Sequence, residues 1–155
     1  MKLLVLSDSH GDVGTMIDFV EQVQPNEIVH LGDCISDAQS LSCVFPDIPM
    51  LMVPGNCDFC IGQPDTLSLE RNGALLVMAH GHQWRVKSGP TAAVAYAQGL
   101  GADILLYGHT HKAACWQVDN LWVLNPGTAG GRGARASCGV IEISRNSIHC
   151  EIRFG

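Results

Sequence analysis

The chain has 155 residues, which suits one domain with a single buried core. Hydrophobic residues make up 46% and charged residues 15%, so the composition is globular and excludes a disordered chain. The formal net charge of −6, with only nine Lys and Arg, argues against a surface built to hold duplex nucleic acid or an anionic membrane by electrostatics.

The N-terminus shows no export signal. Residues 1–6 carry one charge and a short apolar run, whereas a signal peptide needs an apolar core of ~7–15 residues. No apolar run approaches the ~18 residues of a membrane span. Seven cysteines, an odd number spread along the chain, are typical of a reduced protein with free thiols. We therefore expect a cytoplasmic protein that contacts no membrane.

The first third of the chain alternates between strand and helix patterns. Apolar spacing predicts a strand over 2–6, a helix over 12–24 that Pro25 ends, a strand over 27–31, a helix over 37–44 and a strand over 50–53. Two successive strand–helix–strand units predict a parallel sheet at this end of the chain.

The rest of the chain is dominated by hairpin patterns. Residues 66–69 and 74–79 flank Asn72-Gly73, which is a strong turn signal. A helix over 90–100 and a strand over 103–107 follow. Two further hairpins are predicted, over 114–118 with 121–124 and over 140–144 with 148–154. We expect this half to be mostly antiparallel, and the whole chain, 1–155, to form one α/β domain with two sheets and flanking helices.

Short polar segments rich in Gly, Asp, Asn and His follow five of the predicted strands. Ligands bind outside the carboxyl ends of strands in open α/β sheets, so these segments are expected to converge. Imidazole and carboxylate together suit divalent Mn, Fe, Co, Ni or Zn. Any one segment could be an ordinary turn or helix cap, but all five in order indicate a metal site. The segments are Asp8-Ser9-His10, Gly32-Asp33, Gly55-Asn56-Cys57-Asp58, His80-Gly81-His82 and Gly108-His109-Thr110-His111.

These motifs resemble those of the calcineurin-like metallophosphoesterase superfamily. Its motifs run D-x-H, G-D, G-N-H-[DE], H and G-H-x-H, and the matching segments here span residues 8 to 111. The short length and the Asn56-Cys57-Asp58 variant resemble the small bacterial and archaeal phosphodiesterase branch. The resemblance implies a sandwich of two mixed β-sheets with helices outside, which agrees with the element order.

The resemblance also implies two divalent ions, most simply Mn²⁺, with Ni²⁺, Zn²⁺, Fe²⁺ or Co²⁺ as alternatives. A metal-bridging hydroxide would then hydrolyse a small phosphodiester, while both ions stabilise the developing charge. Asp33, Asn56, His80 and Cys57 are the expected catalytic residues. The implied ligands are Asp8, His10, Asp33 and His111 for one ion and Asp33, Asn56, His80 and His109 for the other, with Asp33 bridging.

Three positions are less determined by the resemblance. Most members have His where Cys57 stands, as a general acid, and a thiol of pKa ~8.5 suits that role less well near neutral pH. Cys57 itself, His82 or solvent could protonate the leaving group, and His82 is otherwise expected to orient the site. Arg135, after a Gly-rich segment, is a candidate for phosphate binding and equally a solvated loop arginine. His30 is expected to be a buried, hydrogen-bonded imidazole.

The main alternative is a protein-interaction scaffold with a vestigial site, as in the related retromer subunit Vps29. Every implied metal position here carries a competent donor, which favours the enzyme. A phosphomonoesterase or pyrophosphatase would share the same site. We expect a small phosphodiester substrate and not long nucleic acid, because Lys and Arg are few. The two hairpins expected to be exposed allow a homo-dimer or higher homo-oligomer.

Overall fold

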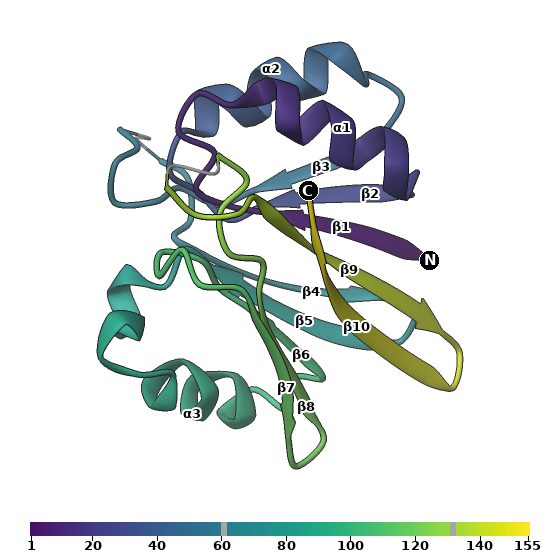
Figure 1. The fold of residues 1–155 in the computed structure, drawn as a ribbon. Helices are drawn as coiled ribbons and strands as arrows, with labels where there is room; N and C mark the ends of the chain where they lie inside the picture. Colours follow the sequence, from purple (N-terminus) through teal and green to yellow (C-terminus); the bar gives the residue numbers. More distant parts are fainter. Residues whose placement is uncertain (60–61, 131–132) are drawn as a thin grey trace.

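The computed structural model describes residues 1–59, 62–130 and 133–155, and its first five-stranded sheet holds both chain ends (Figure 1). The order in this sheet is β10-β9-β1-β2-β3. Strands β1, β2 and β3 are parallel, which confirms the predicted parallel sheet. Strand β9 pairs antiparallel with β1 and with β10. The bounds are β1 (Lys2–Leu6), β2 (Glu27–His30), β3 (Met50–Met52), β9 (Ser137–Ser144) and β10 (Ser147–Phe154).

The second five-stranded sheet has the order β4-β5-β6-β8-β7. Two antiparallel hairpins, β4–β5 and β7–β8, form its sides. Strand β6 pairs parallel with both β5 and β8, so this sheet is more mixed than the predicted, mostly antiparallel arrangement. The bounds are β4 (Thr66–Arg71), β5 (Ala74–Ala79), β6 (Ile104–Leu106), β7 (Ala114–Val118) and β8 (Leu121–Asn125).

Helices cover the outer face of each sheet. Helices α1 (Val13–Val23) and α2 (Ile35–Val44) lie on the first sheet, and α3 (Thr91–Gly99) lies on the second (Figure 1). Two short 3₁₀ helices, His82–Trp84 and Val86–Ser88, precede α3. Asp12 caps α1 by accepting a hydrogen bond from Thr15 N at 3.0 Å. No helix in the described ranges is both long and apolar enough to span a membrane.

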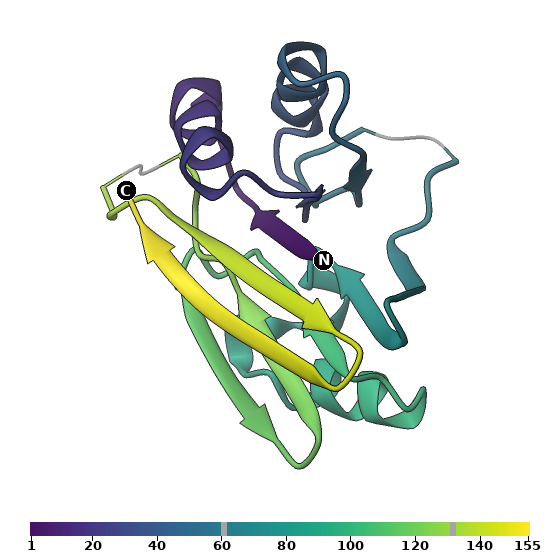
Figure 2. The same cartoon turned by 90° about the vertical axis from the view of Figure 1, so that its right-hand side faces the viewer.

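The core consists of three apolar layers. The middle layer lies between the two sheets and contains Leu3 and Val5 of β1 with Leu76 and Met78 of β5. A second layer packs α1 and α2 against the first sheet, and a third packs α3 against the second sheet. The two sheets face each other in both views (Figure 2). The chain is thus the predicted α/β sandwich of two mixed sheets with helices outside.

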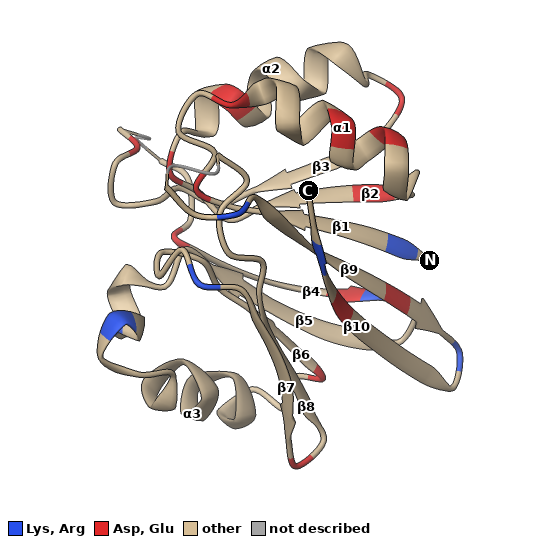
Figure 3. Ribbon diagram, in the orientation of Figure 1, with Lys and Arg blue, Asp and Glu red and all other residues tan. Residues whose placement is uncertain are grey.

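The sheet topology determines where the polar segments lie. The loops after β1, β2, β3, β5 and β6 all leave from one edge of the sandwich, and each carries one polar segment. Lys and Arg are few and lie apart along the ribbon, whereas Asp residues occur in several of these loops (Figure 3). The fold therefore brings the five motifs to one edge, as expected for a ligand site at the carboxyl ends of strands.

Candidate metal centre

Six of the predicted ligands form two groups at this edge. Asp8, His10 and His111 make up the first group, and Asp33, His80 and His109 make up the second. Within each group, one donor atom from each residue lies within 4.8 Å of the others. Residues up to 103 positions apart in the chain therefore offer oxygen and nitrogen donors to a common point, which is the arrangement that a divalent cation requires.

The first group contains a carboxylate oxygen with no hydrogen bond. Asp8 is fully buried, and its Oδ2 accepts hydrogen bonds from Ser7 Oγ at 2.5 Å and from His109 N at 3.0 Å. Its Oδ1 accepts none from the described residues, although His111 Nε2 lies 3.0 Å away. His10 Nε2 lies 3.4 Å from the same His111 nitrogen. A buried carboxylate oxygen left without a hydrogen bond is costly, and a cation shared with the imidazoles would satisfy it.

The second group is formed by atoms that carry lone pairs. His80 is fully buried, and its Nδ1 lies 2.8 Å from Leu31 O. In the neutral ring, donation from Nδ1–H to this carbonyl leaves the lone pair on Nε2. This Nε2 lies 3.1 Å from Asn56 Oδ1, 3.0 Å from His109 Nδ1 and 3.5 Å from Asp33 Oδ1. Acceptor atoms repel one another at such distances unless a cation lies among them. A backbone carbonyl that fixes the tautomer of a ligating His is a typical outer partner in metal sites.

The protonation states also suit cation binding. Burial, the neighbouring His80 and the Lys87 ammonium lower the pKa of His109 to about 4, so its imidazole is neutral at pH 7. Burial tends to raise the pKa of Asp33, but the hydrogen bond from Cys57 N and the neighbouring His80 outweigh this effect, so the pKa is lowered overall. A neutral imidazole and an ionised carboxylate need not lose protons to bind a metal near neutral pH.

The ligand loops adopt a backbone conformation that L-residues seldom use. Five predicted ligands have φ between 48° and 66°, in the left-handed region. Each such residue costs on the order of 1 kcal/mol, and such strain gathers at functional sites. Gly108 allows one of these loops to approach, because a Cβ there would lie 2.0 Å from Ser7 Oγ and 2.9 Å from Asp8 Oδ2. The five are Asp8, His10, Asp33, His109 and His111.

Asp58 links the second and third ligand loops, a role that the sequence analysis did not assign. Its two carboxylate oxygens accept four backbone N–H hydrogen bonds of 2.8–2.9 Å. The position was visible in the sequence as the last residue of the Gly55–Asp58 motif, but its partners were not. The donors are Asp33, Cys34, Ile35 and Gly55.

A chain of hydrogen-bonded polar side chains, from the buried His30 to the half-buried Asp37, holds the first ligand loop. Ser9 Oγ donates to Asp37 Oδ2 at 2.7 Å and lies 3.3 Å from His30 Nε2. Gly11 N donates to the same Asp37 oxygen at 2.7 Å, and Gly32 N donates to His30 Nδ1 at 3.2 Å. His30 is thus the buried, hydrogen-bonded imidazole that was expected. Because His30 Nδ1 accepts, its Nε2 carries the proton and donates to Ser9.

We expect the stability of the metal-free protein to fall in mild acid because of His30. Full burial lowers the pKa of His30 from 6.5 to about 4. Between these values the unfolded chain binds more protons than the folded one, so the free energy of unfolding decreases as the pH falls from about 6.5 to about 4. The loss from this one group is on the order of 3 kcal/mol below pH 4.

Urea unfolding in EDTA at several pH values between 4 and 7 measures this dependence. His30→Gln is expected to flatten the slope, and His149→Gln, at an exposed position of β10, is the control that should not. An equally steep slope in both variants would show that other groups cause the loss.

The remaining candidates lie at different distances from the metal centre. Cys57 is exposed, and Asn56 Nδ2 donates to its sulfur at 3.4 Å. Desolvation and then the Asp33 carboxylate raise the pKa of the Cys57 thiol. The His82 ring centroid lies 5.6 Å from that of His80. The structure does not bring Arg135 to the ligands: its Nε donates to Gly155 O at 3.1 Å, so its contact with phosphate stays a prediction.

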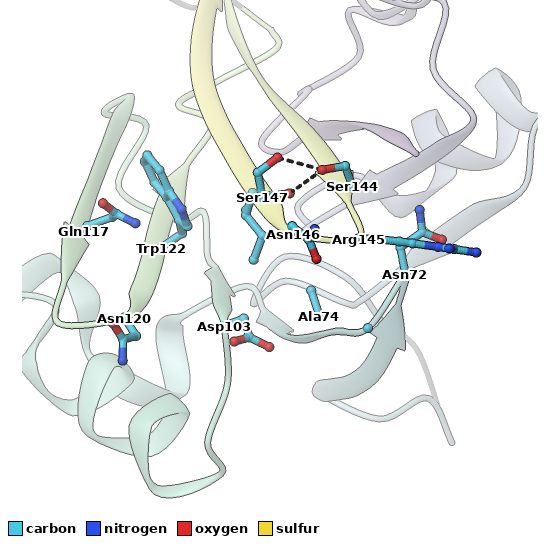
Figure 4. Close-up of a pocket in the computed structure, with 12 residues that line it drawn as sticks. Asn72, Ala74, Asp103, Gln117, Asn120, Trp122, Ser144, Arg145, Asn146 and Ser147 are labelled. Carbon is cyan, nitrogen blue, oxygen red and sulfur yellow. Dashed lines mark hydrogen bonds between the residues drawn. The ribbon is translucent and has the colours of Figure 1, made fainter.

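A separate open pocket of about 430 Å³ lies at the opposite end of the sheets (Figure 4). Three hairpin turns line it, through residues such as Asn72, Asn120 and Asn146, together with Asp103 before β6. None of the predicted metal ligands lines this pocket. This pocket is therefore separate from the edge at which the five motifs lie.

Comparison with known proteins identifies similar chains. The family model of the calcineurin-like phosphoesterase superfamily domain matches residues 1–146. The probable metallophosphoesterase YsnB of Bacillus subtilis is 29% identical over 131 residues, which cover 83% of this chain and 75% of YsnB.

Two solved structures share the fold. A conserved protein of Streptococcus pneumoniae, described as a predicted phosphoesterase, aligns with a TM-score of 0.81 and 26% identity over 99% of this chain and 88% of its own. Vps29 of Entamoeba histolytica in complex with Zn²⁺ aligns with a TM-score of 0.79 and 23% identity over 99% of each chain.

Proposed function

Because the chain belongs to the calcineurin-like phosphoesterase superfamily, we propose that it is a metal-dependent phosphodiesterase that hydrolyses small phosphodiesters at two divalent cations. The observation that carries this proposal is the convergence of oxygen and nitrogen donor atoms in two groups. His80 Nε2 lies within 3.5 Å of acceptor atoms of Asn56 and Asp33, and the buried Asp8 Oδ1 accepts no hydrogen bond from the described residues.

Seven side chains would hold the cations. Mn²⁺ is our first choice, and Ni²⁺, Zn²⁺, Fe²⁺ and Co²⁺ also suit a mixed oxygen and nitrogen donor set. When bound, such a pair lowers the pKa of water toward ~7 and stabilises charge on the phosphoryl oxygens. The proposed ligands are Asp8, His10, Asp33 and His111 for one cation and Asp33, Asn56, His80 and His109 for the other.

The rest of the chain orients these ligands for an in-line displacement. Cys57 N donates to Asp33 Oδ1 at 3.0 Å, and Leu31 O fixes the His80 ring. Asn125 Nδ2 donates to Gly108 O at 3.0 Å and so holds the loop that carries His109. Attack by hydroxide forms one P–O bond and breaks the ester P–O bond, and the leaving oxygen takes up a proton. A site positioned in advance in this way lowers the cost of reaching the transition state.

A diester fits the charges around the second group better than a monoester. Among the described residues, no guanidinium or ammonium group forms a hydrogen bond with Asp33, Asn56, His80 or His109, and the Lys87 ammonium acts on His109 through its charge alone. The cations would then be the main compensation for the charge of the reacting phosphate. A diester brings one negative charge and a monoester close to two, so the diester needs less compensation.

Hydrolysis of bis(p-nitrophenyl) phosphate after complete chelation tests the function. We expect no release of p-nitrophenolate from the metal-free protein and a steady rate once Mn²⁺ is restored. The monoester p-nitrophenyl phosphate should react more slowly under the same conditions. Lack of turnover with any of the five metals would favour the alternative, a scaffold with a vestigial site, for which the structural likeness to Vps29 is the specific support.

Cys57→His is expected to restore a general acid for the leaving group. Hydrolysis of diesters with poor alkoxide leaving groups should rise roughly 10²-fold, whereas release of p-nitrophenolate, which needs no proton, should change little. The slope of log kcat against leaving-group pKa measures the effect, with Cys57→Ser as the control. If the slope is the same in all three proteins, position 57 does not protonate the leaving group.

A further inference from the structure

A second open pocket, of about 450 Å³, has Thr110, from the loop that carries His109 and His111, in its lining. It lies between the 3₁₀ helix Val86–Ser88, the end of β6 and the start of β7. Its volume falls within the range of sites that hold small molecules. The residues that matter here are Lys87, Pro90, Tyr107, Thr110, Lys112 and Trp116.

The pocket is continuous with the loops that carry the metal ligands. Thr110, which lines it, stands between His109 and His111 in the chain. The charge of Lys87, another lining residue, lies close enough to His109 to act on that ring. A group seated in the pocket would therefore lie beside a phosphate held at the cations.

The lining of the pocket combines aromatic rings with positive charge. The rings of Tyr107 and Trp116 meet edge to face, with centroids 6.5 Å apart at 77°. The ammonium groups of Lys87 and Lys112 belong to exposed side chains. None of the described lining residues is Asp or Glu, although the protein has a net charge of −6. A pocket with two cations and no carboxylate is therefore complementary to an anion.

We propose that this pocket binds an arm of the substrate that carries both an aromatic base and a second phosphate. The preferred substrates are then small nucleotidyl diesters with a terminal phosphate, such as a 5′-phosphorylated dinucleotide. Trp116, supported by the largely buried Tyr107, provides an apolar surface for the base, and Lys87 and Lys112 pair with the terminal phosphate. This inference rests on the proposed function, because the scissile diester must sit at the cations.

Two dinucleotides that differ by one phosphate test the inference. The Mn²⁺-loaded protein is given either ApA or 5′-phosphorylated pApA, and the products are separated by ion-exchange chromatography. In both substrates the same internucleotide P–O bond is hydrolysed, so ApA and pApA differ only in the terminal phosphate. We expect kcat/KM to be roughly tenfold higher for pApA, mainly through a lower KM, and the difference to shrink at high salt because the lysines are exposed.

Variants assign the preference to the pocket. A double variant that combines Lys87→Ala and Lys112→Ala should have a higher KM for pApA. The ratio of kcat/KM for pApA to that for ApA should then be close to one. Lys2→Ala, whose ammonium lies near Glu142 at 3.8 Å, is the matched control and should keep the ratio. Far-UV circular dichroism checks that all variants are folded.

Each result decides between the two proposals. If the protein cleaves ApA and pApA equally well, or if the double variant keeps the preference, the pocket does not bind the terminal phosphate, and the proposed phosphodiesterase activity still stands. If neither dinucleotide nor bis(p-nitrophenyl) phosphate is cleaved with any of the five metals, both proposals are overturned.

Discussion

Replacing Asp33 by Asn is expected to lower the metal-dependent kcat/KM by roughly 10³-fold or more and to weaken cation binding strongly. Asp33 is the ligand proposed to bridge the two cations, and only an anionic bridge reduces the repulsion between two divalent ions. An amide has almost the same shape but no charge. Loss of outer partners alone typically costs 10–100-fold in metal sites, so loss of a shared ligand should cost more.

Isothermal titration with Mn²⁺, together with the rate on bis(p-nitrophenyl) phosphate, measures both effects. Asp47→Asn, at an exposed position just after α2, makes the same chemical change away from the site and should behave as the wild type. If Asp33→Asn kept full metal-dependent activity, the assignment of Asp33 as a bridging ligand would be wrong.

Asp58→Asn is expected to lower the free energy of unfolding by about 3–5 kcal/mol, even without metal. The Asp58 carboxylate accepts four backbone N–H hydrogen bonds from two loops. An Asn side chain has one acceptor oxygen and turns its NH₂ group toward other N–H groups. Hydrogen bonds to a charged group contribute about 1.5–3 kcal/mol each, and the donors that lose their partner are partly buried.

Urea unfolding in EDTA measures this loss, and Asp18→Asn, on the exposed side of α1, is the control. The Mn²⁺ affinity of the Asp58 variant should also fall, because the loops that carry Asp33 and Asn56 would no longer be held together. A loss of metal affinity at unchanged stability would instead mean that Asp58 acts on the cations rather than on the loops.

The sequence was sufficient to predict the strands and the edge at which they place their polar loops. Strands such as β1 are short apolar runs, and the alternation with α1 and α2 indicated the parallel pairing that β1, β2 and β3 show. The parallel pairing of β6 with β5 and β8 was missed, because pairing between distant segments leaves no local pattern. Strand β9 begins at Ser137, three residues before the predicted start.

The sequence predicted that these polar residues would lie together, but it did not predict the contacts that hold them in place. The order of the motifs, each after a predicted strand, predicted that Asp8, His80 and His109 lie in one site. The groups that hold these ligands in place come from distant loops. Leu31 O contacts the His80 ring, and Asp58 accepts hydrogen bonds from four backbone N–H groups. The spacing of residues along the sequence does not predict such contacts. Arg135 was predicted to bind phosphate only because it follows a Gly-rich segment. In the structure its guanidinium contacts the C-terminal residues.

Anomalous diffraction at the manganese edge, from crystals of the protein grown with Mn²⁺, tests the central claim most directly. We expect two anomalous peaks per chain, one among Asp8, His10 and His111 and one among Asn56, His80 and His109, with Asp33 in contact with both. A single peak, or no peak near Asp33 at saturating Mn²⁺, would contradict the dinuclear site on which the proposed chemistry depends.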